Sequence, residues 1–131
     1  MAAFRFALRR FQAFSEVNAL QVGLTAQQHQ ALLAIKAHVG HEPMTIGELA
    51  DTLIIKNHSA VGLVARLADR GLATREASVI DKRRVVLRIT PAAEALVETV
   101  TRQHLRELTR SAPAIKDLLA TLKKVDETGR G

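Results

Sequence analysis

Apolar residues recur at helical spacing in two short segments in the middle of the chain. In residues 45–53 they stand three or four positions apart, which places on one face of a helix Ile46, Leu49, Ala50 and Leu53. Thr45 and Glu48 have the spacing of a capping box, in which each side chain accepts a hydrogen bond from the backbone of the other residue. The pattern therefore predicts a helix that starts after Thr45.

A second helix is predicted from residue 57 to about residue 70. The side expected to pack on a core holds Ala60, Leu63, Val64 and Leu67. Asn57 is expected to cap the start, because its side chain can accept from a free backbone N–H. Gly71 is typical of the position directly after a helix. Two such helices, joined by residues 54–56, make a helix-turn-helix.

Two extended segments follow, at residues 72–76 and 84–89. The second is rich in β-branched residues and places Val85, Leu87 and Ile89 on one side. Residues 77–83 between them are expected to form a hairpin loop. The order of these elements is that of a winged helix-turn-helix, so the predicted fold class is mainly α with a small β-hairpin, the wing.

Both ends of the chain carry more apolar residues than a winged helix needs. All four Phe residues lie in a predicted N-terminal helix, and a long helix is expected to start at Pro91 with Thr90 as its cap. Residues 111–113 are expected to interrupt that helix, and Pro113 to start a last one. The apolar residues expected to meet a second chain are Phe4, Leu8, Phe11, Ile115, Leu118, Leu119 and Leu122.

Helices from both ends of one chain, each with an apolar stripe, can pair with those of a second copy around a twofold axis. The sequence therefore predicts a homodimer whose N- and C-terminal helices form a dimerisation lobe. The alternative is that the stripes fold onto the core of the same chain.

The exposed side of the second helix has small residues at its centre and polar residues at its edges. A helix that enters the major groove of DNA benefits from this arrangement, because polar side chains near its N-terminus can reach base edges. The candidate DNA-binding residues on this helix are Lys56, Asn57, His58, Ser59, Gly62 and Arg66. Alternatively, Gly62 and Ala65 only allow close packing against another part of the protein.

The predicted hairpin carries the densest positive charge in the chain. Lys82, Arg83, Arg84 and Arg88 fall within seven residues, and the first three are the candidate DNA-binding residues of the wing. A basic hairpin suits the minor groove, where Arg can enter. Asp81 is expected to orient a nearby Arg. The alternatives are a solvated hairpin or a winged helix used only for protein contacts, which has no need of three adjacent cations.

Composition narrows the classes of protein without identifying one. Lys and Arg exceed Asp and Glu by six, but the excess is spread along the chain, so the hairpin is stronger evidence than the net charge. The absence of cysteine excludes disulfides, thiolate metal sites and thiol-based sensing. No phosphate loop, Ser-His-acid motif or apolar run of membrane length is present, so we expect a cytoplasmic protein that is not an enzyme and needs no cofactor. His38, His41 and Glu42 give only a weak metal signal, and no metal site is expected.

Several segments, in this order and spacing, resemble the MarR family of bacterial and archaeal transcription regulators. They are the runs at residues 24–33, 45–53 and 58–67, together with 81–83 and 87–90. The resemblance covers nearly the whole chain and implies one domain, with 1–24 and 111–131 for dimerisation, 25–90 as the winged helix and 91–110 as a linking helix. It further implies a dimer that binds double-stranded DNA at pseudo-palindromic operators, mostly as a repressor.

Many members of that family release DNA when they bind small aromatic or anionic ligands. A ligand site in this chain would lie where the helix after Pro91 meets the first two helices, and polarity alone gives as candidates Arg9, Arg10, His29 and His104. Each of these residue types is more often an ordinary surface or packing residue. The family's wing often reads Asp-x-x-Asp-x-Arg, whereas this chain has Ser78 at the first Asp position, so one ion pair that braces the wing is not expected here.

Overall fold

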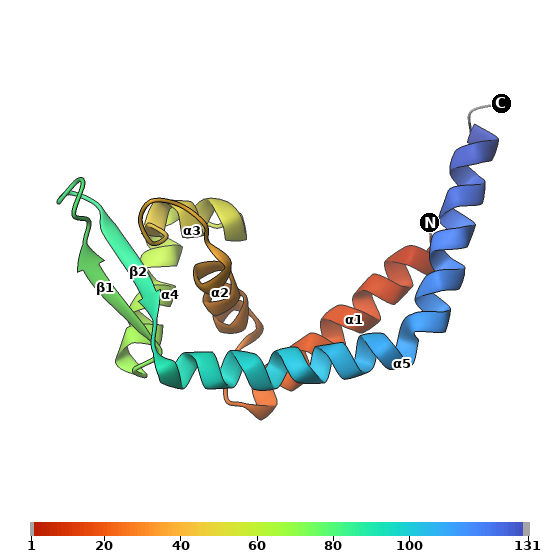
Figure 1. The fold of residues 1–131 in the computed structure, drawn as a ribbon, viewed down its shortest axis with the longest axis horizontal. Helices are drawn as coiled ribbons and strands as arrows, with labels where there is room; N and C mark the ends of the chain where they lie inside the picture. Colours follow the sequence, from red (N-terminus) through yellow and green to blue (C-terminus); the bar gives the residue numbers. More distant parts are fainter. Residues whose placement is uncertain (1, 130–131) are drawn as a thin grey trace.

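The structure is a computed structural model that describes residues 2–129, without the side chains of residues 111, 114, 115 and 118. The elements run in the order α1 (Ala2–Gln21), α2 (Ala26–Ala37), α3 (Ile46–Leu53), α4 (Asn57–Asp69), β1 (Ala73–Ala77), β2 (Val85–Ile89) and α5 (Pro91–Gly129). Helices α2, α3 and α4 and the hairpin form one lobe, from which α5 leads away alongside α1 (Figure 1). The predicted mainly α fold with a β-hairpin wing is confirmed.

The core lies where α2, α3 and α4 meet β2 and the start of α5. All four residues of the predicted apolar face of α4 are buried, and Leu49 and Ala50 of α3 lie beside them. The capping box of α3 is present, since Thr45 Oγ1 accepts from Glu48 N at 3.1 Å and Glu48 Oε1 accepts from Thr45 N at 3.2 Å. The spacing of apolar residues therefore identified both helices of the helix-turn-helix.

The start of α4 differs from the prediction. Lys56, not Asn57, is the N-cap residue, and its side chain makes no capping hydrogen bond. Asn57 is already inside the helix. Ile54, which ends α3, adopts a left-handed conformation with φ of 57°. Gly71, with φ of 69°, follows the helix as expected. The first turn of α4 thus has N–H groups without a side-chain cap.

The two strands pair antiparallel, with Ala73 opposite Ile89 and Ala77 opposite Val85. A third segment joins β2 on its other edge, since Leu87 N donates to Met44 O at 2.8 Å and Thr45 bridges to Val86. The predicted strand bounds are confirmed within about one residue. The sequence indicated only one apolar side for β2, whereas both Val86 and Leu87 are buried.

Helix α5 begins as predicted, with Thr90 Oγ1 accepting from Ala93 N at 3.2 Å. The predicted interruption at residues 111–113 is wrong, because α5 is continuous for 39 residues with Pro113 inside it. A proline within a helix removes one backbone hydrogen bond and crowds the preceding turn, which a bend can relieve. Figure 1 shows that α5 changes direction in its second half. The linking helix and the last helix are therefore one bent element.

Among residues 2–129, no helix is both long and apolar enough to cross a membrane.

Candidate nucleic-acid interface

The outward side of α4 carries the predicted polar residues. Asn57, His58, Ser59 and Arg66 are exposed, and Gly62 is half-buried. A Cβ built on Gly62 would lie 3.4 Å from Nη1 of Arg66, and no other atom of the described residues outside the helix backbone lies within 4 Å. Within the described chain, no other element therefore packs closely against Gly62.

The N-terminus of α4 differs from those of α2 and α3. Those two helices have complete capping boxes, at Thr25 with Gln28 and at Thr45 with Glu48. At α4 the cap residue is Lys56, whose side chain is exposed and makes no capping bond. Free N–H groups, the positive end of the helix dipole and a lysine together favour an anion such as a phosphate.

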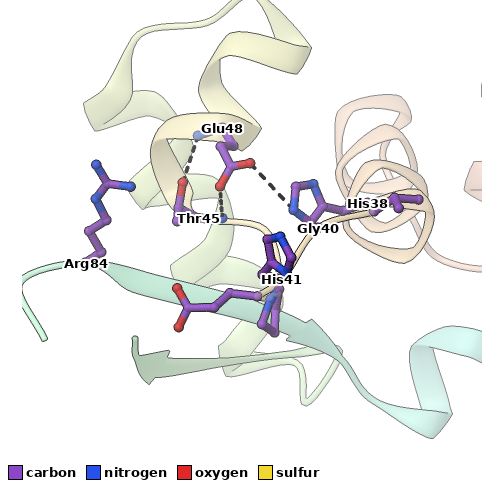
Figure 2. A pocket seen from close by; sticks show the side chains of 9 residues that line it. His38, Gly40, His41, Thr45, Glu48 and Arg84 are labelled. Carbon is purple, nitrogen blue, oxygen red and sulfur yellow. Dashed lines mark hydrogen bonds and ion pairs between the residues drawn. The ribbon is translucent and has the colours of Figure 1, made fainter. Parts of the chain in front are cut away.

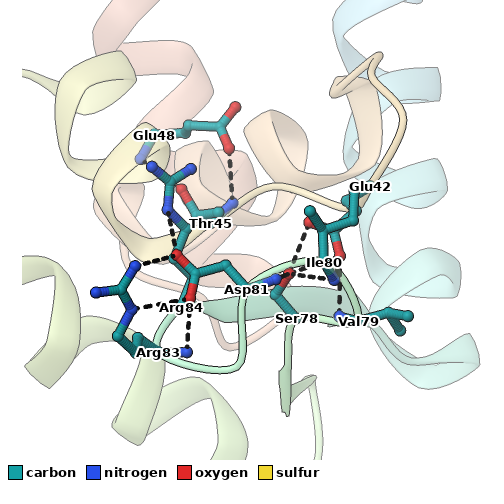
Figure 3. A network of polar contacts seen from close by, with 9 residues as sticks. All are labelled: Glu42, Thr45, Glu48, Ser78, Val79, Ile80, Asp81, Arg83 and Arg84. Carbon is teal, nitrogen blue, oxygen red and sulfur yellow. Dashed lines mark hydrogen bonds and ion pairs between the residues drawn. The ribbon is translucent and has the colours of Figure 1, made fainter.

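The wing loop is ordered around Asp81, as predicted. Oδ1 of Asp81 accepts from both N and Nε of Arg83 at 3.1 Å, and Arg84 Nε lies 3.8 Å from Oδ2 (Figure 3). The hydrogen bond from the Arg83 side chain is the main reason why the pKa of Asp81 lies below its usual value. Arg83 and Arg84 nevertheless stay largely exposed, so one acid holds two guanidinium groups in place without burying them.

A second carboxylate braces the wing and was missed by the sequence reasoning. Glu42, in the loop between α2 and α3, accepts from Ser78 Oγ at 2.7 Å and from Val79 N at 3.0 Å (Figure 3). The bond from the Ser78 hydroxyl is the largest cause of the lowered pKa of Glu42. Ser78 itself is only 1% exposed. At position 78, where the family often has Asp, this chain thus has a Ser that braces the wing by donating to Glu42, 36 positions earlier in the sequence.

The histidines beside Glu42 do not gather into a metal site. His38 Nε2 lies 3.5 Å from Glu48, and His41 lines the same pocket (Figure 2). Glu42 is already bound to the wing. In the described part of the chain, no three His, Cys, Asp or Glu side chains are placed to hold a metal ion. The pocket measures about 180 Å³, and a neighbouring, more open one that His38, His41 and Glu42 also line measures about 510 Å³.

Two of the four predicted ligand residues meet where α1, α2 and α5 come together. The rings of His29 and His104 are 5.6 Å apart and nearly perpendicular, and Phe11 and Phe14 lie against His104. Nε2 of each histidine is buried without a hydrogen-bond partner among the described residues, as is Nδ2 of Asn18. Burial lowers the pKa of both histidines, and the neighbouring His104 lowers that of His29 further.

This histidine pair predicts that the folded protein loses stability in acid. Because the folded state disfavours the charged imidazoles, the unfolded chain binds more protons once the pH falls towards the ordinary value of 6.5. The stability contributed by the neutral pair is present above that value and is lost as the pH falls further. Urea midpoints should therefore be lower at pH 5.5 than at pH 7.5. The double variant His29→Gln/His104→Gln should reduce the difference, whereas the exposed-site control His58→Gln should keep it.

The remaining ligand candidates and the dimerisation residues lie mostly at the surface. Arg9 and Arg10 are exposed on α1, and the guanidinium of Arg10 lies 5.9 Å from the ring centre of Phe6. Of the residues expected to meet a second chain, Phe4, Leu8, Phe11 and Leu119 are 37–59% exposed and Leu122 is half-buried. Ile115 and Leu118 lie among those whose side chains are outside the described set.

Comparison with known proteins gives the same family as the sequence motifs. The sequence profile of the MarR family matches residues 22–84, and no curated protein matches the chain. Similar structures include a mutant of MepR from S. aureus bound to an oligodeoxyribonucleotide, with 21% identity, a TM-score of 0.73 and coverage of 95% of this chain and 94% of that one.

A mutant of MarR from E. coli has 23% identity, a TM-score of 0.73 and coverage of 93% and 92% of the two chains. MepR from S. aureus bound to ethidium bromide has 21% identity, a TM-score of 0.67 and coverage of 95% and 92%. Because these sequence identities are low, the structural similarity establishes the fold of this chain alone.

Proposed function

We propose that this chain is a DNA-binding transcription regulator of the MarR family, whose sequence model matches residues 22–84, and that it acts as a dimeric repressor on a pseudo-palindromic operator. Helix α4 would read the major groove, and the wing would grip the phosphates or the minor groove beside it. Occupation of the operator would block the promoter by steric occlusion.

The observation that carries this proposal is the pairing of an uncapped, polar α4 N-terminus with a braced cationic wing. Helix α4 contacts β1, so the helix and the hairpin pack against each other within one lobe. Arg83 and Arg84 are oriented by Asp81 and remain exposed, which is the arrangement needed to meet a phosphate backbone. A winged helix that only contacts proteins has no use for such a cationic array.

The proposed dimer explains the apolar surface that one chain leaves uncovered. Part of each stripe does fold onto the core of the same chain, since Ala19, Val97 and Val100 are buried. The outer part, on α1 and α5, remains exposed along two helices that run side by side (Figure 1). Twofold pairing of these faces would place the two α4 helices about one turn of DNA apart, roughly 34 Å, which requires a palindromic site.

Binding to selected DNA tests the proposal. Duplexes would be selected from a random pool by the wild-type protein and then titrated by fluorescence anisotropy at two salt concentrations. We expect an enriched sequence with twofold symmetry, two chains per duplex, and much weaker binding to a scrambled duplex. Equal weak binding to both duplexes would favour the alternative, a winged helix that contacts proteins and does not bind specific DNA.

His58 and Asn57 are expected to read bases. The variants Asn57→Ala and His58→Ala should each weaken binding to the selected duplex by roughly 1–3 kcal/mol and relax the preference at one position of each half-site. A suitable control is His41→Ala, which removes an exposed histidine outside α4. Repeating the selection with each variant provides the measurement; an unchanged sequence preference for both α4 variants would exclude their role as base readers.

The junction of His29 and His104 is the place where we propose that a small aromatic or anionic effector acts. Its support is the set of unpartnered polar atoms beside the Phe11 and Phe14 rings. A ligand with an aromatic ring and a hydrogen-bonding group would match both features. Because α5 links this junction to the hairpin, a ligand there could shift the dimer lobe relative to the wing.

A further inference from the structure

The tip of the wing carries two large apolar side chains that no part of the described chain covers. Val79 is 92% exposed and Ile80 is 76% exposed. Single apolar residues at a surface are common, but here two neighbours stand together in the loop that joins β1 to β2, at the end of the hairpin away from α5 (Figure 1). The DNA-binding role assigned to the wing cations does not account for them.

The backbone beneath these two side chains is held by several hydrogen bonds. Oε1 of Glu42 accepts from Val79 N at 3.0 Å, and Oγ of Ser78 accepts from Ile80 N at 3.2 Å and from Asp81 N at 3.0 Å. The turn is closed by Arg84 N, which donates to Asp81 O at 2.9 Å. Figure 3 shows Val79 and Ile80 beside this network, with the Val79 side chain directed away from it. The tip is therefore a braced apolar segment whose backbone N–H groups already have hydrogen-bond partners.

The charges around the tip indicate what it contacts. Asp81 follows Ile80, and the next three residues, Lys82, Arg83 and Arg84, are all exposed. The two carboxylates beside the tip are already engaged, that of Asp81 by Arg83 and that of Glu42 by Ser78 and Val79. Proteins that enter the minor groove combine basic side chains for the phosphates with apolar side chains that press on sugars and base edges. An apolar protein partner would be a poor match for this cationic surround, whereas duplex DNA matches both parts.

We propose that Val79 and Ile80 form an apolar contact with the minor groove of the bound duplex, and that Glu42 is the positioning residue that holds them for it. This inference rests on the proposed DNA-binding function. The apolar contact would contribute a part of the binding free energy that does not depend on salt, because it displaces water and no counterions.

The test compares the double variant Val79→Ser/Ile80→Ser with Val39→Ser, on the duplex selected by the wild-type protein. Val39 is also 92% exposed but lies in the loop between α2 and α3, so it is the matched control. We expect the tip variant to bind about 5- to 20-fold more weakly with an unchanged salt slope, because a groove contact buries only part of each side chain, and full burial of one alone would contribute more than about tenfold. The control should bind like the wild type, and all three proteins should melt alike.

Hydroxyl-radical footprinting locates the contact, because it cleaves at deoxyribose hydrogens in the minor groove. The wild type and Val39→Ser should protect minor-groove sugars flanking each α4 site, and the tip variant should lose that protection. Unchanged affinity and unchanged protection in the tip variant would overturn this inference while leaving the proposed function intact. A wild-type protein that selects no duplex would overturn both.

A double-mutant cycle tests the role of Glu42. If Glu42 acts by holding the tip, Glu42→Ala should itself weaken binding, and the tip substitutions should have a much smaller effect in the Glu42→Ala background. Glu42→Gln, which keeps an acceptor oxygen for Ser78 and Val79, should recover part of the affinity. Additive effects of the two sets of substitutions would show that Glu42 does not position the tip.

Discussion

The variant Leu8→Asp is expected to be a folded monomer that binds the selected duplex about 10²- to 10⁴-fold more weakly than the wild type. Leu8 is 45% exposed on α1, so a charge there costs little in the isolated chain but cannot be buried against a second copy. When the two chains separate, the second half-site is no longer bound intramolecularly, and the gain from effective concentration is lost. Mass measurement by light scattering should give 14.3 kDa for the variant and twice that for the wild type.

Two comparisons make this result specific. Val39→Asp places the same charge at a site that is 92% exposed outside α1 and α5, and it should remain dimeric with full DNA affinity. Phe11 is less suitable as a target because its ring also contacts His104 within the chain. If Leu8→Asp stayed dimeric, the exposed stripe on α1 would not be the dimer contact, and the α5 residues would have to form it alone.

The helix-turn-helix was predictable because its signals are local. Thr45 and Glu48 are three residues apart, and the buried residues of α4 repeat every three or four positions, so each signal can be read within one helix. The hairpin was predictable for the same reason, from two extended segments around a loop. Asp81 could also be assigned, since Arg83 and Arg84 are its near neighbours in sequence.

The N-cap of α4 and the end of the long helix were predicted wrongly, because the residue-type rule used for each did not hold in its structural context. Asn57 is a good cap residue, but after the left-handed turn at Ile54 the helix α4 starts with Lys56 as its N-cap. Pro113 is a strong helix breaker, but the turns on both sides of it continue the helix, and a bend accommodates the ring. In both cases the residue type was read correctly and its position relative to the helix was not.

The features that could not be predicted depend on contacts between distant segments. Glu42 and Ser78 are separated by 36 positions and meet only because the loop after α2 runs beside the hairpin. The sequence alone indicated only that an acid usually present at position 78 was missing. A buried serine in a basic loop needs a partner, and that requirement was the one signal that could have suggested a carboxylate elsewhere in the chain.

Polarity alone could not separate the ligand candidates that lie at the helix junction from those that lie at the surface. His29 and His104 do meet at the junction of α1, α2 and α5, while Arg9 and Arg10 lie exposed on α1. The difference lies in where α1 packs, because residues 2–13 are all exposed and its buried residues, Asn18 and Ala19, are near its C-terminal end. Helix α5 follows β2 directly in the chain and carries His104, so it connects the hairpin to this junction.

The double variant Arg83→Ala/Arg84→Ala is expected to bind both selected and scrambled duplexes at least about tenfold more weakly, with a salt slope lower by about two. Each arginine that meets a phosphate releases roughly one counterion, and this contribution is the same for every sequence. The two side chains are 91% and 69% exposed, so their truncation should leave the melting temperature nearly unchanged. Anisotropy titrations at several salt concentrations provide both the affinity and the slope.

The matched control is Arg102→Ala/Arg106→Ala, which removes the same charge from exposed positions on α5. It lowers the net charge equally, so any loss caused only by long-range attraction appears in both variants. A loss confined to the wing variant would assign it to direct phosphate contacts. If the wing variant kept its affinity and salt slope, the wing would not contact DNA, and specific binding would have to rest on α4 alone.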